Sequence, residues 1–155
     1  MAKKVKLLIW LFLFSAASVG AQSINVITIQ ELDFGDTIFP GIEKTILFTD
    51  SNAAQFEITG EPDREVLIQF QLPEALEDQQ SNSLDISFST SDAGYHSTVS
   101  GAMNATVFNP NSGTTATLNS EGKLYVWVGA TAMPLHTQAG NYYQENLILE
   151  VDYTL

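Results

Sequence analysis

The sequence predicts an all-β protein: an immunoglobulin-like antiparallel β-sandwich after an N-terminal signal peptide. Apolar and polar residues alternate along much of the chain, which is typical of strands with one buried face. Helical periodicity is nearly absent. Gly, Pro, Asn, Asp and Ser separate the alternating segments, and the number and spacing of these segments suit two packed sheets.

Residues 1–21 have the composition of a secretory signal peptide. Lys3, Lys4 and Lys6 precede an apolar stretch that is shorter than the ~20 residues needed to span a bilayer. Small residues then lead to Ala21, after which we expect cleavage. A transmembrane anchor is the less favoured alternative. The chain is therefore expected in the periplasm, at the cell surface or in the extracellular space.

The expected mature chain, residues 22–155, is long enough for one self-supporting domain. Loss of the three N-terminal lysines leaves three basic residues against eighteen acids, a net charge of −15. Such a chain repels phosphate backbones and anionic lipids, so we expect no nucleic-acid partner and no membrane insertion of the mature chain. Because the chain has no cysteine, disulfides, thiolate metal ligands and thiol catalysis are excluded.

Nine segments are predicted to be strands, each bounded by turn-forming residues. They are residues 24–29, 45–48, 54–58, 66–72, 84–88, 105–108, 115–118, 124–128 and 147–153. The last is the clearest case, because two sets of side chains alternate along it. Leu147, Leu149, Val151 and Tyr153 form one set, and Ile148, Glu150, Asp152 and Thr154 form the other.

Two local arrangements are also predicted. A turn at residues 60–63 is expected to join segments 54–58 and 66–72 as an antiparallel pair. Residues 73–78 begin with proline and contain acids, which suits a short helix as well as it suits a loop. Residues 89–122 are rich in Ser, Thr, Asn and Gly, which favours exposed hairpins.

Few residues are suited to catalysis. His96 and His136 are the two histidines, and neither has an acidic or histidine neighbour at metal-ligand spacing. No Gly-x-Ser-x-Gly motif or Gly-rich phosphate loop occurs. Carboxylate pairs such as Asp33 with Asp36 are so frequent that solvated turns explain them better than glycosidase chemistry. We therefore expect that the chain is not an enzyme and binds no cofactor. Weak calcium binding by loop carboxylates is a remote alternative.

Tyr125 and Trp127 share one face of the segment 124–128 and leave two interpretations open. In the favoured one they pack beneath a loop or the other sheet. In the alternative they form an exposed aromatic surface for a sugar ring or a partner subunit.

Four segments in order resemble the bacterial family of secreted domains designated DUF4402. The resemblance spans nearly the whole mature chain and implies a pilin-like or spore-coat-like β-sandwich with no catalytic residues to transfer. It also suggests a role for Tyr142, which follows Gly140-Asn141. The hydroxyl of this tyrosine would hold a corner of the sandwich by a hydrogen bond to nearby backbone. The segments are Glu31-Leu32-Asp33-Phe34-Gly35 with Pro40-Gly41, Ala53 through Pro62, Val128-Gly129-Ala130-Thr131, and Ala139-Gly140-Asn141-Tyr142.

Gly140 and Tyr153 are also similar to the glycine and near-terminal tyrosine of chaperone-usher pilins, although Tyr153 is third from the end rather than second and no disulfide is present. Assembly by donated strands needs a free alternating extension. Residues 22–30 are the only candidate, and they are more simply the first strand of a complete sandwich.

The sequence therefore favours a structural or adhesive surface protein, fimbria-like in its assembly, that self-associates or contacts other surface proteins through strand edges. The alternative is an extracellular module that binds a glycan or a host ligand through Tyr125 and Trp127. The residues expected in edge or exchanged strands are Ile24, Val26, Leu147, Leu149, Val151 and Tyr153.

Overall fold

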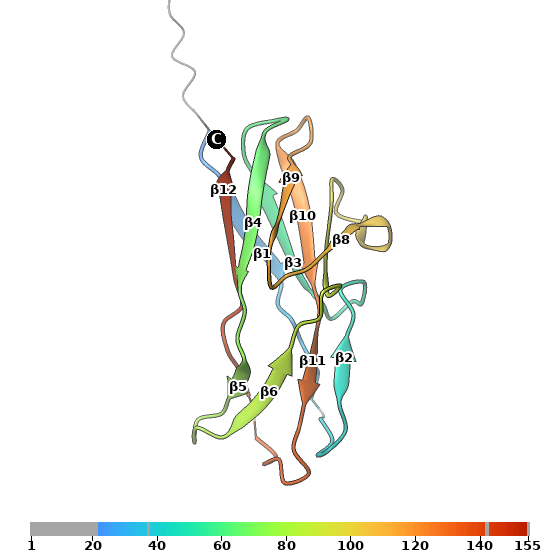
Figure 1. Cartoon of the computed structure of the whole chain (residues 1–155), viewed down its shortest axis with the longest axis vertical. Helices are drawn as coiled ribbons and strands as arrows, with labels where there is room; N and C mark the ends of the chain where they lie inside the picture. Colours follow the sequence, from blue (N-terminus) through green and yellow to red (C-terminus); the bar gives the residue numbers. More distant parts are fainter. Residues whose placement is uncertain (1–21, 37, 142, 155) are drawn as a thin grey trace, which may run out of the picture.

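The structure is a computed structural model that describes residues 22–36, 38–141 and 143–154. The predicted signal peptide and Tyr142 lie outside the described residues. The described chain is all-β, as predicted, and its antiparallel strands form a sandwich (Figure 1). The elements are β1 (Asn25–Gln30), β2 (Lys44–Ile46), β3 (Ala54–Thr59), β4 (Glu65–Gln71), β5 (Ala75–Glu77), β6 (Ser83–Ser87), β7 (Ala93–His96), the 3-10 turn η1 (Ala102–Asn104), β8 (Thr106–Phe108), β9 (Thr114–Thr117), β10 (Lys123–Val128), β11 (Ala130–Met133) and β12 (Ile148–Tyr153).

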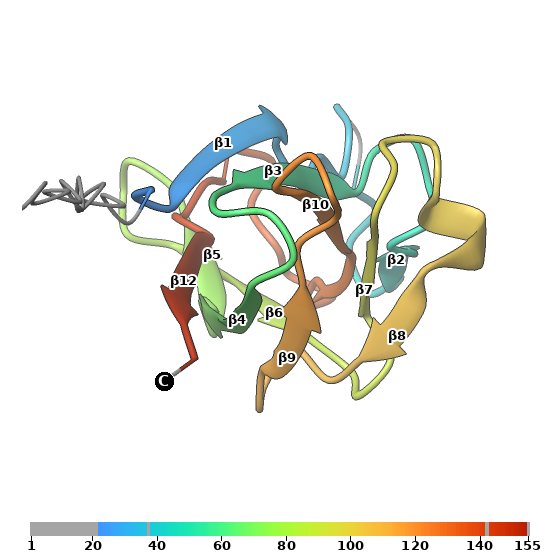
Figure 2. The same ribbon diagram turned by 90° about the horizontal axis from the view of Figure 1, so that it is seen from above.

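The strands are arranged in three sheets. A five-stranded sheet has the order β1-β3-β10-β7-β8, a four-stranded sheet the order β2-β11-β6-β5, and a three-stranded sheet the order β12-β4-β9. The five-stranded and three-stranded sheets face each other, with β1 and β12 on the same side of the molecule (Figure 2). The four-stranded sheet extends toward the end of the molecule opposite the C-terminus (Figure 1).

Pro73 and Gly129 mark two of the points where the chain passes from one sheet to another. Pro73 separates β4 from β5, where a residue without an N–H group suits an interruption of the ladder. Gly129 separates β10 from β11, and a Cβ atom built on it would lie 2.1 Å from the Ile46 carbonyl oxygen. The crossing at Gly129 therefore needs a residue without a side chain, because another backbone passes directly against it.

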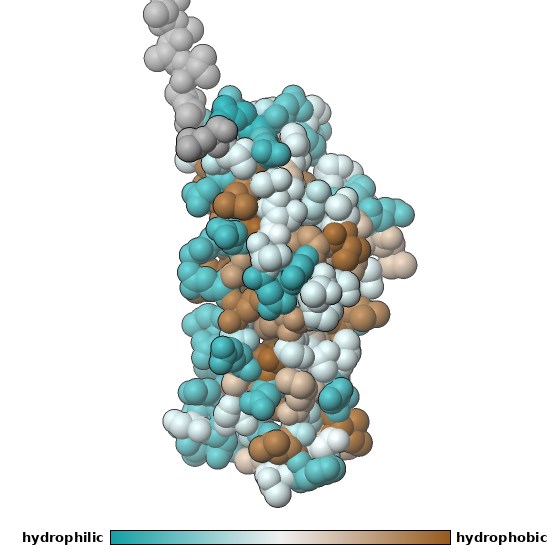
Figure 3. Space-filling model, in the orientation of Figure 1, coloured by the Kyte–Doolittle hydropathy of each residue, from teal (hydrophilic) through white to brown (hydrophobic). Residues whose placement is uncertain are grey.

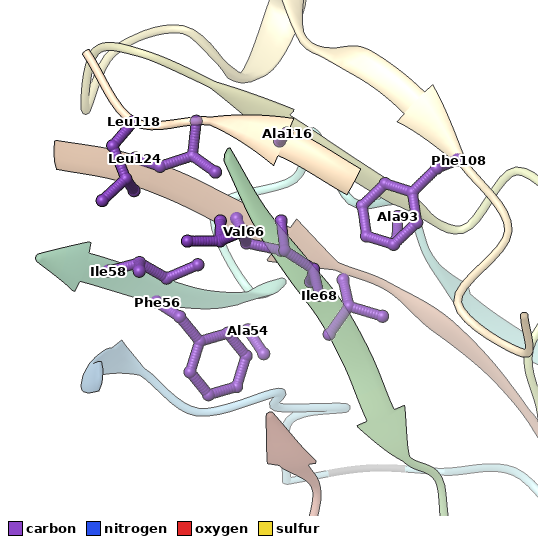
Figure 4. Packing of buried hydrophobic residues seen from close by; sticks show 12 residues of the cluster. Ala54, Phe56, Ile58, Val66, Ile68, Ala93, Phe108, Ala116, Leu118 and Leu124 are labelled. Carbon is purple, nitrogen blue, oxygen red and sulfur yellow. The ribbon is translucent and has the colours of Figure 1, made fainter. Parts of the chain in front are cut away.

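The main core fills the space between the five-stranded and three-stranded sheets. Figure 4 shows Val66 and Ile68 of β4 among side chains from the facing sheet, and both are fully buried. A second buried cluster covers the four-stranded sheet. The main cluster consists of Ala54, Phe56, Ile58, Val66, Ile68, Ala93, Phe108, Ala116, Leu118, Leu124, Val126 and Val128, and the second of Phe34, Ile46, Ala53, Leu84, Ile86, Ala130 and Ala132.

Two local predictions are wrong. Residues 54–58 and 66–72 are strands, but β3 pairs with β1 and β10 while β4 pairs with β12 and β9. The turn at residues 60–63 therefore joins two sheets, so that both strands place apolar side chains in the shared core. Residues 75–77 are neither helix nor loop but form β5, because Ala75 and Leu76 pair with β6.

The sequence also misses β7 and β11. Ala93-Gly94-Tyr95-His96 has too short an alternation to stand out, yet β7 lies between β10 and β8. Ala130-Thr131-Ala132-Met133 contains two alanines, which have weak strand propensity, and no large β-branched or aromatic residue, yet β11 pairs with β2 and β6. Each of these strands is paired with a strand on both sides, so its conformation depends on its neighbours in the sheet more than on its own sequence.

Candidate functional site

Two long edge strands, β1 and β12, lie at one side of the sandwich. β1 is the terminal strand of the five-stranded sheet and pairs with β3, and β12 is the terminal strand of the three-stranded sheet and pairs with β4. Residues 25–30 thus form the first strand of the sandwich, as the favoured interpretation has it. The six residues predicted for edge or exchanged strands all pack against the main core: Ile24, Val26, Leu147, Leu149, Val151 and Tyr153.

The composition of β1 differs from that of β12 in charge. β1 has the sequence NVITIQ, without a charged residue, proline or glycine. Ile27 and Ile29 of β1 are exposed at 49% and 46%. β12 has the same length but exposes Glu150 and Asp152. Charges on an edge strand oppose pairing with another chain, whereas a neutral strand rich in β-branched residues favours it.

Tyr153 ties the two facing sheets together at the end of the sandwich where the described chain begins and ends. Its hydroxyl oxygen accepts a hydrogen bond from the Glu61 N–H at 2.6 Å and donates one to the Gln22 carbonyl at 2.9 Å. The Arg64 guanidinium lies 5.3 Å from the centre of its ring. Tyr153 therefore makes a hydroxyl tie of the kind that the sequence suggested for Tyr142.

Tyr125 and Trp127 lie on the face of the five-stranded sheet that points away from the main core. They are exposed at only 8% and 4%, and their ring centroids are 6.4 Å apart. Phe48 and Ala105 cover the adjacent Gly94, so tightly that a Cβ atom there would meet the Phe48 ring at 2.8 Å. The packed interpretation is therefore confirmed, and the exposed aromatic surface predicted as its alternative is wrong.

A polar group borders these aromatic residues. The Lys123 ammonium lies 3.1 Å from a Glu57 carboxylate oxygen. The hydrogen bond from Lys123 is the largest cause of a lowered pKa of the Glu57 carboxyl, and the hydrogen bond from Tyr125 lowers this pKa further. Burial is the largest cause of a raised pKa of the Tyr125 hydroxyl, and the hydrogen bond to Glu57 is the second. This arrangement fixes both ends of an ion pair and leaves the tyrosine neutral at physiological pH.

A large groove lies beside the four-stranded sheet, with a volume of about 1340 Å³. We call it the β5–β6 groove, because Leu76 of β5 and Leu84 and Ile86 of β6 form its floor. Its walls come from residues 31–36 and 143–147, which precede β2 and β12. The groove thus joins segments from near both ends of the described chain.

Asp78 holds one end of this groove together. Its carboxylate accepts hydrogen bonds from the backbone N–H groups of Gln80 and Asn82, both at 2.8 Å. The side-chain amides of Asn82 and Asn141 donate to it as well. Desolvation raises the pKa of the Asp78 carboxyl, but these hydrogen bonds outweigh it and leave the pKa below its ordinary value. Asp78 is therefore an ionised anchor that connects the turn after β5 to the segment before β12.

Tyr143 and Gln138 hold the adjoining wall. The Tyr143 hydroxyl donates to the Ala139 carbonyl at 2.9 Å and accepts from the Gln138 side-chain amide at 2.8 Å. The same amide donates to the Ser83 carbonyl at 3.0 Å. The wall is therefore fastened to β6 by side chains instead of a continuous strand ladder.

The rim of the groove is acidic. Glu31, Asp33, Asp36 and Glu145 line it, and none of the described lining residues is Lys, Arg or His. The Lys44 ammonium does approach this wall at Gly35. Sequence reasoning missed the groove because its residues come from distant segments. The alternation of acidic and apolar residues at 31–34 was the available signal.

The two histidines lie apart, His96 on a strand and His136 in a loop, and each makes local structural contacts in the described chain. His96 on β7 is half-buried, and its Nδ1 accepts a hydrogen bond from the Thr98 N–H at 3.1 Å. His136 follows β11, is exposed, and lies against Gly41. Asp33 accepts a hydrogen bond from the Gly35 N–H at 2.6 Å in a local turn. Within the described ranges, no three His, Asp or Glu side chains are placed together to hold a metal ion.

Comparisons with known proteins give no match, either to a family model or to a curated protein. The resemblance to the DUF4402 family therefore stays a prediction based on the four sequence segments. In the part of the chain that the structure describes, no helix is long and apolar enough to span a membrane.

Proposed function

We propose that the mature chain is an exported structural or adhesive surface protein whose copies associate through β1, in a fimbria-like manner. The observation that carries this proposal is the open edge of β1, which is neutral and exposes Ile27 and Ile29. An edge strand presents unpaired backbone N–H and C=O groups to another strand. Pairing would satisfy these groups and cover the two isoleucines.

Charge favours β1 over β12 as the contact between copies. Two identical chains with a strong acidic excess repel each other, and contact at a neutral surface avoids the strongest part of this repulsion. Antiparallel self-pairing of β12 would place Glu150 and Asp152 near the same residues of the second copy, which is unfavourable. β1 brings no such charges.

The broad face seen in Figure 3 offers less to a partner than the β1 edge does, because its apolar side chains are scattered among polar ones. The alternative function, a module that binds a glycan or a host ligand, would need a surface other than Tyr125 and Trp127, since both are buried. The predicted absence of catalysis stays part of the proposal. It is supported by the local structural roles of His96 and Asp33.

Light scattering on the purified mature chain over a range of concentrations tests the proposal. The wild-type mass should rise with concentration, and Ile27→Lys should stay monomeric, because a charge on an edge strand blocks pairing. Because residue 27 is paired with Glu57 of β3, the new positive charge lies beside a carboxylate, and the fold should tolerate the substitution. Ile148→Lys on β12 is the matched control and should associate like the wild type.

Two results would count against the proposal. One is a wild-type chain that remains a monomer throughout the concentration range. The other is an Ile148→Lys variant that loses association as completely as Ile27→Lys, since the contact would then not be specific to β1.

A further inference from the structure

We propose that the β5–β6 groove binds an extended segment of another polypeptide that carries both apolar and cationic side chains. This inference goes beyond self-association, because the outward-facing Ile27 and Ile29 of β1 do not line the groove. Binding in the groove and pairing at β1 are thus separable by experiment.

The dimensions of the groove suit a polypeptide segment. Its volume of about 1340 Å³ exceeds the ~300–1,000 Å³ of ordinary small-molecule sites. Its lining extends from Thr28 of β1 and Ala54 of β3, in the five-stranded sheet, to Pro40 and Gln138, in the loops before β2 and after β11 of the four-stranded sheet. The groove therefore follows the long direction of the molecule, as an extended chain would.

Apolar side chains in the groove remain incompletely covered. Burial of such surface stabilises a complex by roughly 25 cal/mol per Å², so a ligand with apolar side chains gains from covering them. Five apolar lining residues are only half-buried: Leu32, Ile38, Leu76, Phe88 and Leu147. Because successive side chains of an extended segment point in opposite directions, alternate residues of the ligand can face this floor.

The rim determines the charge of the ligand. Glu31, Asp36 and Glu145 are exposed lining residues, and the whole chain is strongly acidic. Lys44 is the cation that approaches the wall at Gly35, and the acids outnumber it. Lys or Arg side chains on the ligand would therefore be attracted, and acidic ligands would be repelled.

The backbone of the walls favours a peptide over a compact amphiphile. The described part of residues 31–43 contains no strand, and residues 143–147 make only an isolated bridge, between Gln144 and Glu77. Some backbone groups of these walls are already bonded, such as the Asp33 N–H to the Asn52 carbonyl and the Gln144 N–H to the Glu77 carbonyl. Because the walls lie outside a continuous ladder, their other backbone groups can pair with an extended chain. The side-chain amides of Asn146 and Gln144 add further donors and acceptors.

A labelled peptide of about seven residues with alternating Lys and Val, the length of an ordinary strand, is a suitable probe. Fluorescence anisotropy should show that it binds the mature chain, and that matched peptides of alternating Glu and Val or of Lys and Gly do not. Repeating the titration on the Ile27→Lys variant should leave the affinity unchanged, which separates this site from the β1 contact.

Two sets of variants test the location. Neutralising Glu31→Gln, Asp36→Asn and Glu145→Gln together should weaken binding about threefold to tenfold at low salt, since each exposed charge pair contributes little. Asp85→Asn, Glu121→Gln and Asp152→Asn together remove the same net charge outside the groove and should change affinity by less than about twofold. Leu76→Ser should weaken binding, whereas Ile148→Ser should not.

Three outcomes would overturn the inference. The first is no detectable binding of the Lys-Val peptide. The second is an equal loss of affinity in the two triple variants, which would show attraction by net charge alone. The third is an unchanged affinity in Leu76→Ser, which would place the peptide elsewhere.

Discussion

The Tyr153 hydroxyl donates a hydrogen bond to the Gln22 carbonyl oxygen at 2.9 Å and so connects the last strand to the residues that precede the first. The same oxygen accepts from the Glu61 N–H in the turn after β3. One side chain of the three-stranded sheet therefore holds two segments that flank strands of the five-stranded sheet. In a chain without disulfides, this tie limits separation of the two sheets at their common end.

Tyr153→Phe should lower the free energy of unfolding by about 1–3 kcal/mol, because it leaves the half-buried Glu61 N–H without its partner. Urea denaturation of a protein comprising residues 22–155 measures the change. Thr154→Val is the control, since it removes hydrogen bonds to Glu65 from a neighbouring position of the same strand end. An equal loss in both variants would mean that the tyrosine hydroxyl has no special role.

The Glu57–Lys123 pair should make stability depend on pH in the acid range. The pKa of Glu57 in the folded protein lies below its ordinary value of 4.5, so the ion pair stabilises the fold above that pH. The contribution should be lost as the pH falls through the lowered value. Glu57→Gln should therefore flatten the fall of unfolding free energy between neutral and acid pH, as measured by urea denaturation at each pH.

Lys123→Met provides the cross-check for this pair, because Lys123 is the largest cause of the lowered pKa. It should flatten the same part of the profile. Since both side chains are partly exposed, the effect on stability at neutral pH should be small. If Lys123→Met leaves the profile as steep as the wild type, the lowered pKa has another origin.

Alternation predicts a strand well where one of its faces is covered and the other exposed along its whole length. Leu149, Val151 and Tyr153 illustrate this, because β12 alternates between half-buried and exposed residues as expected. Alternation does not specify which strands are neighbours. Val66 and Ile58 face each other across the core from different sheets, and either a hairpin or a crossing between sheets would give the same pattern.

The candidate site was harder to predict for a related reason. The neutral composition of β1 is visible in the sequence, but its position at a sheet edge depends on the neighbours of β3. Trp127 pairs with Gly94 of the adjoining strand, and Phe48 and Ala105, which are remote in sequence from Trp127, cover that glycine. The β5–β6 groove brings Glu31 beside the chain around Glu145, which only the tertiary fold can do.

Gly129→Ala should be among the most destabilising single substitutions. Its Cβ atom would lie 2.1 Å from the Ile46 carbonyl oxygen and 2.7 Å from the Phe48 nitrogen, and backbone atoms cannot move aside as a flexible side chain can. We expect a loss of about 3 kcal/mol or more, at the upper end of overpacking effects. Gly140→Ala, with no atom within 4 Å of the new Cβ, should change stability by less than about 1 kcal/mol. Similar losses in both variants, measured by urea denaturation, would contradict this account of the crossing between β10 and β11.

The fluorescence of Trp127 should show whether the outer face of the five-stranded sheet is buried. Trp10 lies in the predicted signal peptide, so Trp127 is the single tryptophan of residues 22–155. Because Trp127 is only 4% exposed, its emission should be blue-shifted in the folded protein and weakly quenched by acrylamide. Unfolding in urea should shift the emission to longer wavelength and increase the quenching. Phe48→Ala should raise the quenching of the folded protein, since Phe48 covers the strand beside Trp127. Strong quenching of the folded wild type would instead revive an exposed aromatic surface, and with it the glycan-binding alternative.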